Sequence, residues 1–206
     1  MDLTPPAPAD AEEIAARLAA GEWVVDLRSR IAFADGHVAG SVNVEADGNP
    51  GTYLAWLVPW GRPVTLLAAT PAQLAAAQRA LARVGVDRPA AAATGTPADW
   101  LPAGVPPARL TRATFADLAA AGPAVVLDVR RASERANGWI AGSIHIPIHH
   151  LRDRVRDLPP GPIWVHCAAG LRAAIAASLL AGAGHDVIAV DDDFAAAARA
   201  GLPMAA

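Results

Sequence analysis

Short apolar runs recur along the chain, and stretches rich in Ala and Leu separate them. The runs contain Val, Ile and Leu with little polar alternation, which is typical of strands that are buried on both faces of a parallel sheet. The stretches between them have high helix propensity. The two patterns together predict an α/β fold in which small parallel sheets carry helices on both faces.

The first half of the chain is predicted to begin with a helix whose capping box pairs Asp10 with Glu13 and which ends at Gly21. The Pro-rich segment Pro5–Pro8 before it is predicted to be a loose tail. The further elements of this half are strands at 23–27, 42–44, 64–67 and 89–93 and a helix at 71–84. Those of the second half are helices at 112–121, 170–182 and 193–200 and strands at 124–129, 143–146, 162–166 and 186–190.

The two halves are copies of one pattern. Asp26 and Arg28 correspond to Asp128 and Arg130 at a constant offset of 102 residues, and the offset later becomes 99. Each copy has the size of a compact domain, about 100 residues. A segment rich in Pro and Gly lies between the copies and is expected to connect them. We therefore predict a domain at 1–95, a linker at 96–108 and a domain at 109–206.

Composition narrows the classes of partner. The net charge of −3 gives no general attraction to nucleic acid or to an anionic membrane surface. No apolar run reaches transmembrane length, and the N-terminus does not look like a secretory signal. We therefore expect a cytoplasmic protein with no nucleic-acid or membrane partner, in which a thiol stays reduced.

Cys167 is the only cysteine in the 206 residues. It lies between the predicted strand at 162–166 and the predicted helix at 170–182, at the sheet edge where ligands of such folds bind. Free N–H groups and the positive end of the helix dipole stabilise a thiolate there and can bind an anion. Cys167 is therefore the candidate nucleophile, and a buried structural cysteine is the alternative.

The residues after Cys167 complete the candidate site. Gly170 permits a tight turn, and Arg172 supplies a permanent cation that could orient an anionic donor or clamp the loop. Backbone amides of this loop are expected to bind the substrate, and the residues concerned are Ala168, Ala169, Gly170 and Leu171. Asp128 and Arg130 follow a neighbouring strand and are expected to brace the site, with an ordinary structural ion pair as the alternative.

The first copy lacks these groups. Ala68 stands where the second copy has Cys167, and Pro71 and Gln73 stand at the positions of the glycine and the arginine. The first domain is therefore expected to fold without thiol chemistry and to serve in packing, in dimerisation or in shaping access to the other site.

Several segments resemble the rhodanese (sulfurtransferase) family, namely Asp128-Val129-Arg130, Glu134, 142–147 and 167–172. The resemblance spans nearly the whole chain as a tandem pair with the inactive domain first. Residues 51–63 resemble the rhodanese part of fusions with a metallo-β-lactamase-like persulfide dioxygenase, although no His-x-His-x-Asp-His run occurs.

The resemblance implies that sulfur passes from thiosulfate or a small persulfide to a thiol or cyanide through a Cys167 persulfide, with no cofactor. The implied partners are a small sulfur-donor anion and a thiol acceptor, and a homodimer or a separate partner domain stays open.

Two other functions remain open at this stage. The chain could be a non-catalytic module that senses persulfides or binds a partner. A phosphatase or arsenate reductase would also use a cysteine and an arginine around an oxyanion, although the related phosphatases place one more residue between the two. No metal is expected, because the histidines of the second half lack the spacing of ligands and suit surface or packing positions; they are His145, His149, His150 and His166.

Overall fold

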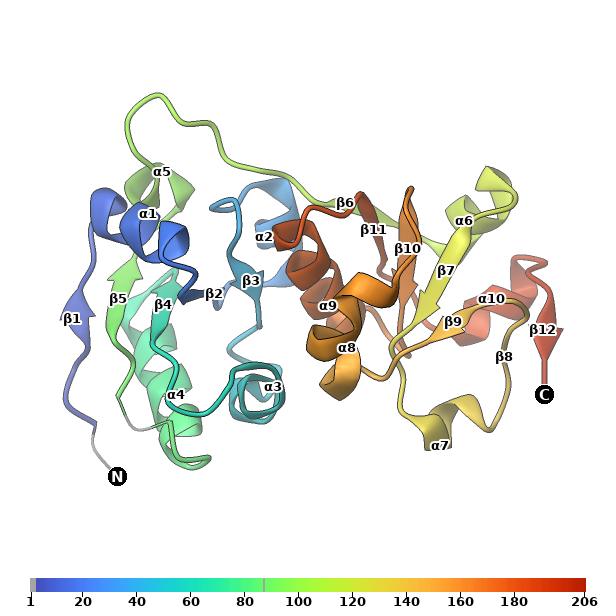
Figure 1. The fold of residues 1–206 in the computed structure, drawn as a ribbon, viewed down its shortest axis with the longest axis horizontal. Helices are drawn as coiled ribbons and strands as arrows, with labels where there is room; N and C mark the ends of the chain where they lie inside the picture. The colour runs from blue at the N-terminus through green and yellow to red at the C-terminus, as the bar shows by residue number, and fades with distance from the viewer. Residues whose placement is uncertain (1–2, 87) are drawn as a thin grey trace. The chain divides into compact units, whose positions relative to one another are not determined.

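Each half of the chain folds around its own five-stranded parallel sheet, which confirms the predicted fold class (Figure 1). The computed structural model describes residues 3–86 and 88–206. Contacts between residues divide the chain into two units, the first ending at Arg109 and the second running from Leu110 to Ala206.

The first unit has the strand order β1-β5-β4-β2-β3. Its strands are β1 (Ala7–Pro8), β2 (Trp23–Asp26), β3 (Val42–Asn43), β4 (Val64–Ala68) and β5 (Ala91–Thr94). Its helices are α1 (Ala11–Ala19), α2 (Arg30–Asp35), α3 (Pro50–Leu57), α4 (Pro71–Ala82) and α5 (Pro97–Trp100). Asp10 caps α1, because its carboxylate accepts a hydrogen bond of 2.9 Å from the Glu13 amide. The other half of the predicted capping box is not formed, since the Glu13 carboxylate pairs with Arg17.

Two segments of the first unit differ from the expectation. Part of the predicted loose tail is strand β1, which pairs with β5 and forms the edge of the sheet. An edge position tolerates Pro8 because a missing N–H there removes no central sheet bond. Residues 96–108, expected to be a linker, include α5, and the Trp100 side chain of that helix is only 1% exposed. Burial of this indole joins the segment to the core of the first unit.

The second unit repeats the same topology with the strand order β6-β11-β10-β7-β9. Its strands are β6 (Thr111–Ala113), β7 (Val125–Asp128), β9 (Ile144–His145), β10 (Ile163–His166) and β11 (Val187–Val190), and β8 (Trp139–Ile140) pairs antiparallel with β12 (Met204–Ala205). Its helices are α6 (Phe115–Ala121), α7 (Ala132–Arg135), α8 (Ile148–Arg154), α9 (Leu171–Gly182) and α10 (Ala195–Arg199), with a 3₁₀ turn at Val155–Asp157.

The prediction of a helix at 112–121 is wrong for its first residues. Thr111–Ala113 forms the edge strand β6, and α6 begins only after Thr114. Thr114 and Asp117 form a capping box, in which the Asp117 carboxylate accepts from the Thr114 amide at 2.8 Å. This cap stops the helix from extending backward.

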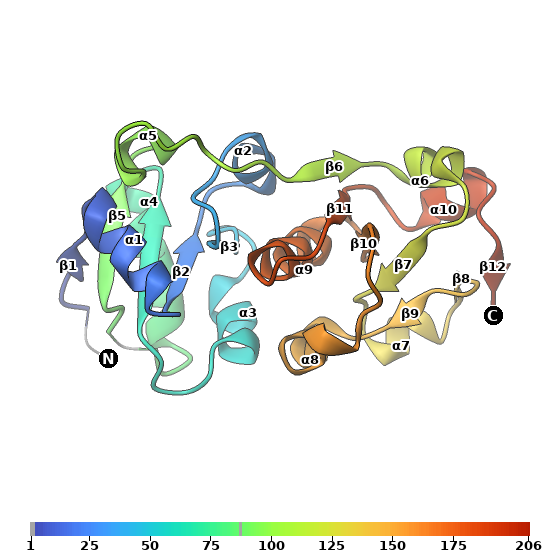
Figure 2. The same ribbon diagram turned by 45° about the horizontal axis from the view of Figure 1, so that its top comes forward.

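Helices cover both faces of the second sheet (Figure 2). Neighbouring residues of a strand face opposite sides, and both Val165 and His166 of β10 are fully buried. Helix α9 contacts β10 and β11, while α6 contacts α10 and shares a core cluster with Val190. The carboxyl end of β10, and with it Cys167, is therefore held between two covered faces.

Candidate active site

Cys167 follows directly on the carboxyl end of β10. This strand pairs with β7 so that His166 lies opposite Asp128, which places the ends of both strands at the same edge of the sheet. The Cys167 thiol is free and only 2% exposed, whereas Ala168 is half-buried and Ala169 is exposed. Cys167 is therefore screened from solvent, while the two small residues after it lie nearer the surface.

The loop between β10 and α9 offers hydrogen-bond donors. The amides of Ala168, Ala169 and Leu171 donate no hydrogen bond to any residue that the structure describes, whereas the Gly170 amide faces the Asp192 carbonyl across the β-bridge between Ala169 and Asp193. Helix α9 is 12 residues long, and its first main-chain bond runs from the Ala174 amide to the Gly170 carbonyl at 2.9 Å. Unpartnered amides at the start of a helix are suited to bind an anion.

Gly170 is required by the geometry of this loop. Its φ is +84°, and a Cβ atom built on it would lie 2.0 Å from Oδ1 of Asp191. Asp191 follows β11 and is held by Arg112, whose Nη2 donates to Oδ2 at 2.5 Å. The loop is thus packed directly against a carboxylate on the neighbouring strand.

Arg172 pairs with Glu134 through two hydrogen bonds. Its Nη1 and Nη2 atoms donate to the two carboxylate oxygens at 2.6 Å and 2.7 Å. Hydrogen bonding by Arg172 lowers the pKa of Glu134 to about 2. Of the two roles expected for Arg172, this contact corresponds to clamping: it ties the first turn of α9 to α7.

Asp128 and Arg130 form a buried ion pair beside the loop. Nη2 of Arg130 donates to Oδ2 of Asp128 at 2.7 Å and to the Gly138 carbonyl at 2.9 Å. Burial by itself would raise the pKa of Asp128, but hydrogen bonds from Arg130 outweigh it, and the pKa of this carboxyl is lowered.

The first unit contains the same pair without a cysteine. Arg28 donates to Asp26 and to the Gly36 carbonyl, the latter at 2.8 Å. Each guanidinium also lies over an aromatic ring, Trp100 in the first unit and Phe194 in the second. Because the arrangement recurs where no thiol exists, it favours a structural role for Asp128 and Arg130.

The side chain of His166 packs in the core. Its ring centroid lies 5.5 Å from that of Phe115 and 5.3 Å from that of Phe194, and the residue is fully buried. Burial lowers the pKa of His166 to about 4, so the ring is neutral at pH 7. Its Nε2 atom has no hydrogen-bond partner among the described residues and lies 3.9 Å from Oδ2 of Asp128.

We expect His166 to make the protein less stable as the pH falls. The unfolded chain takes up a proton near pH 6.5, while the folded ring does so only near pH 4, so stability is lost as the pH falls through this window. The free energy of unfolding should drop by roughly 2 kcal/mol between pH 7 and pH 5 from this group. Urea unfolding at several pH values measures it. In His166→Phe, which keeps an aromatic ring, this part of the pH dependence should vanish; an unchanged profile would contradict the assignment.

In the first unit a side chain occupies the corresponding loop. Gln73 accepts a hydrogen bond of 2.8 Å from the Ala69 amide, the counterpart of the Ala168 amide, and its Nε2 donates to the Leu27 carbonyl at 2.9 Å. The loop of the first unit therefore lacks a sulfur atom, and one of its donors is already satisfied.

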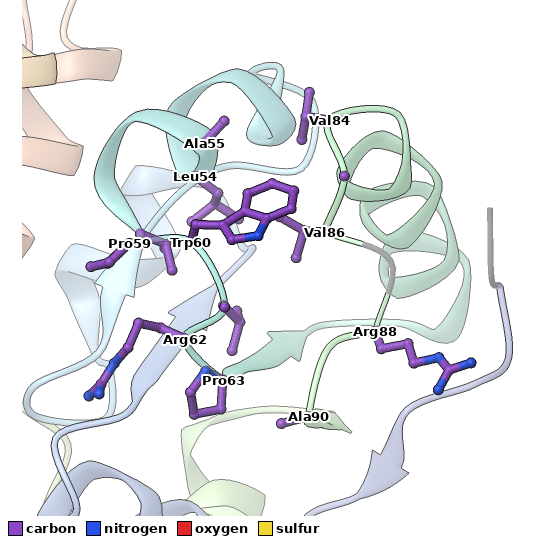
Figure 3. A pocket seen from close by; sticks show the side chains of 14 residues that line it. Leu54, Ala55, Pro59, Trp60, Arg62, Pro63, Val84, Val86, Arg88 and Ala90 are labelled. Carbon is purple, nitrogen blue, oxygen red and sulfur yellow. The ribbon is translucent and has the colours of Figure 1, made fainter.

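The segment 51–63 forms part of a cavity in the first unit, not in the unit with Cys167. The cavity measures about 430 Å³, and most of its lining residues are apolar. In Figure 3 the Trp60 indole lies between the side chains of Leu54 and Val86. The indole is 82% exposed and passes Gly85 so closely that a Cβ there would lie 2.7 Å from the ring.

The residues that the structure describes contain no group of three or more His, Cys, Asp or Glu side chains placed to hold a metal ion. None of the described helices is both long enough and apolar enough to cross a membrane.

The fold and the site define a tandem α/β protein with a thiol at the carboxyl edge of its second sheet. The model of the rhodanese-like domain matches the chain twice, over residues 10–98 and 111–200. These matches cover most of the chain, which therefore belongs to the rhodanese-like domain family. None of the curated proteins compared with the chain matches it.

Several solved structures are similar to parts of the chain. A thiosulfate sulfurtransferase from Pseudomonas aeruginosa is 20% identical over 97% of this chain and 41% of its own, with a TM-score of 0.42. A rhodanese-related protein from Thermoplasma volcanium is 33% identical over 46% of this chain and 97% of its own, with a TM-score of 0.43. The reduced CoADR-RHD of Bacillus anthracis is 31% identical over 44% of this chain, which spans only 17% of that protein, with a TM-score of 0.40.

Sequence reasoning missed part of the surroundings of the thiol. It assigned no role to Glu134, Asp191 or Arg112. Asp191 follows β11 at the same sheet edge as Cys167, so its position after a strand was a usable signal. The Arg112 partner carried no such signal, because it belongs to the edge strand that was expected to be a helix.

Proposed function

We propose that the second unit transfers sulfane sulfur through Cys167. The Cys167 thiolate attacks the outer sulfur of thiosulfate or of a small persulfide, and a new S–S bond forms. The bond between the two donor sulfurs breaks, and its electron pair leaves with sulfite or with the carrier thiolate. A thiol of the cell, or cyanide in an assay, then takes the outer sulfur and regenerates the Cys167 thiolate.

The observation that carries this proposal is the free Cys167 thiol beneath a loop with unpartnered amides, in a unit of the rhodanese-like family. A persulfide would extend from Cys167 by one S–S bond of about 2.05 Å. Amides around such an anion stabilise it as oxyanion donors stabilise oxygen, at about 3 kcal/mol for each donor removed. The burial of Cys167 strengthens this interaction, because it keeps water away from the charge.

The residues around the loop hold its shape in this proposal. Arg172 with Glu134 fixes the start of α9, and Asp128 with Arg130 fixes the end of β7. In this proposal both pairs are positioning groups, and the backbone amides of the loop bind the transferred sulfur. The first unit would not transfer sulfur, because Ala68 replaces the thiol and Gln73 binds the loop amide.

The proposal is tested by incubating the protein with thiosulfate, and in parallel with mercaptoethanol persulfide, followed by cyanide. We expect intact-mass spectrometry to show the gain of one sulfur atom on the protein before cyanide is added, and thiocyanate to form over many turnovers afterward. A single stoichiometric release would instead identify a non-catalytic persulfide sensor. No mass gain from either donor would contradict the proposal.

The phosphatase alternative receives no support from the site. It would need Arg172 to bind a tetrahedral oxyanion, but both terminal nitrogens of this side chain donate to Glu134. Hydrolysis of an aryl phosphate by the protein, absent in Cys167→Ser, would restore this alternative.

A further inference from the structure

We propose that the cavity of the first unit binds a small aromatic carboxylate, with the flat apolar body inside and the carboxylate at the rim. The residues that line this cavity come from α3 and the loop after it, and from the segment between α4 and β5. Cys167 belongs to the second unit, so the binding is independent of the sulfur transfer proposed above.

The Trp60 indole forms one wall of the cavity and is held in place. It is 82% exposed, although a ring of this size usually packs against other groups. It lies against Gly85, whose φ is +85°, and a Cβ atom there would be 2.7 Å from the ring. The indole is therefore a fixed flat surface, which loses little conformational freedom when a ligand packs on it.

The opposite side of the cavity is apolar. Figure 3 shows Pro63 and Ala90 across the cavity from the Trp60 ring. The Ala90 amide is already bonded, since it donates to the Val64 carbonyl at 2.8 Å. The volume of about 430 Å³ falls within the range of small-molecule sites. An aromatic face opposite aliphatic side chains suits a flat hydrocarbon body.

The second unit is hollow at the corresponding place but has a different lining. The offset of 99 residues pairs Val84 with Ala183 and Val86 with His185, and both partners line a cavity of about 610 Å³. None of the residues described around that cavity is a Trp, Tyr or Phe, and its charged residues include Arg152, Asp153 and Arg156. The fold therefore accounts for the hollow in both units, whereas the aromatic and aliphatic lining belongs to the first unit.

Two arginines stand at the rim of the first unit's cavity. Arg62 and Arg88 line it from opposite sides, and both residues are exposed (Figure 3). Nη2 of Arg62 donates to the Gly21 carbonyl at 3.3 Å, and this neutral partner leaves the charge of the guanidinium uncancelled. The rim therefore attracts an anionic group.

The other charged groups near the lining do not reverse this sign. Arg83 precedes the lining segment and adds positive charge. Asp87 lies outside the described residues, and at full charge it offsets only one arginine. Glu22, next to the Arg62 partner in the chain, is held by Arg17 at 2.8 Å. The amides of residues 84–86 bond the last carbonyl groups of α4. A surplus of positive charge remains.

This surplus distinguishes ligands by their head group. A carboxylate at the rim is attracted, an ammonium group is repelled and a hydroxyl group is unaffected. For charges about 7 Å apart at a hydrated surface, one arginine changes the affinity by roughly threefold at low salt. The carboxylate and the ammonium form of one ligand should therefore differ by about tenfold.

The experiment uses the full chain and three probes that share one ring system, namely naphthalene-2-carboxylate, 2-naphthylmethanol and 2-naphthylmethylammonium. We expect the affinity to decrease in this order, with about tenfold between the extremes at low ionic strength. Calorimetry or ligand-observed NMR should give a dissociation constant on the order of 1 mM or below for the carboxylate. The difference should shrink as salt is added, which a steric preference would not show.

Three variants assign the binding to this cavity. Trp60→Ala removes the aromatic wall and should weaken the binding of all three probes about tenfold, and because the indole is exposed the fold is kept. Arg62→Gln should weaken the carboxylate about threefold and leave the alcohol unchanged. Ile31→Ala is the matched control, because Ile31 is an exposed apolar residue of α2 outside the cavity. Its affinities should equal those of the wild type.

Equal binding of the three probes, or binding that Trp60→Ala leaves unchanged, would overturn the inference. Sedimentation tests whether a second copy of the chain covers the cavity instead. A dimer that Trp60→Ala dissociates and that excludes the probes would also overturn it. Cys167→Ser should bind the probes as the wild type does, so a failure of this binding and a failure of sulfur transfer are separate results.

Discussion

Replacement of Cys167 by Ser is expected to reduce thiocyanate formation by roughly 10³-fold or more, as the loss of a catalytic nucleophile does in other enzymes. Ser has nearly the same volume, so the buried site keeps its packing, while a hydroxyl at neutral pH cannot act as the sulfur nucleophile. Initial rates with a persulfide donor and cyanide measure the effect, and intact mass should show no added sulfur on the variant.

The first unit offers a demanding control for this result. Ala68→Cys in the Cys167→Ser protein places a thiol at the corresponding position, where Gln73 already binds the neighbouring amide. We expect this protein to stay inactive, because a thiol without a free loop does not complete the site. Turnover in Cys167→Ser close to that of the wild type would show that another group performs the chemistry.

Gly170→Ala is expected to damage both stability and turnover. A non-glycine residue at φ +84° costs about 1–3 kcal/mol, and the new Cβ would lie 2.0 Å from the Asp191 carboxylate, so the loop or β11 must shift. We expect the free energy of unfolding to fall by more than about 3 kcal/mol and turnover to fall by roughly 10²-fold, since misplacement by about 1 Å has that effect. Denaturant unfolding and initial rates measure the two.

The contribution of the close contact can be separated from that of the backbone. Gly184 has φ +90° in the same unit, and no atom lies within 4 Å of the place that a Cβ would take, so Gly184→Ala carries the backbone strain alone. It should lose only about 1–3 kcal/mol of stability and keep its turnover. Asp191→Ala should restore part of the stability of Gly170→Ala. Equal losses in the two glycine variants would contradict the role given to Asp191.

The tandem architecture followed from the sequence because its signals are local and occur twice. Apolar runs marked the central strands, and the offsets of 102 and 99 residues matched strands that occupy the same places in the two sheets. Among the edge strands, β3 and β9 lie within the strands predicted at 42–44 and 143–146, whereas β1 and β6 were missed. The residues of β1 belong to a Pro-rich segment and those of β6 lie next to a helix, and both strands exist only because a neighbouring strand offers its free edge.

The surroundings of Cys167 could be predicted only in part. The cysteine and its loop were visible because they lie between a strand and a helix. The pairing of Arg172 with Glu134 could not be predicted, because the order of charged residues along the chain does not show which acid forms an ion pair with which base. The contact of Asp191 with Gly170 likewise depends on β10 and β11 being neighbours.

By itself, the sequence determined the α/β class, the duplication and the position of the one cysteine, because hydrophobic periodicity, helix caps and residue identity act within a few residues. The tertiary structure alone decided that the Cys167 thiol is buried, that Arg172 is held by Glu134 and that Asp191 packs against Gly170. These features join residues far apart in the chain, and they arise only when the parallel strands bring their carboxyl ends to one edge.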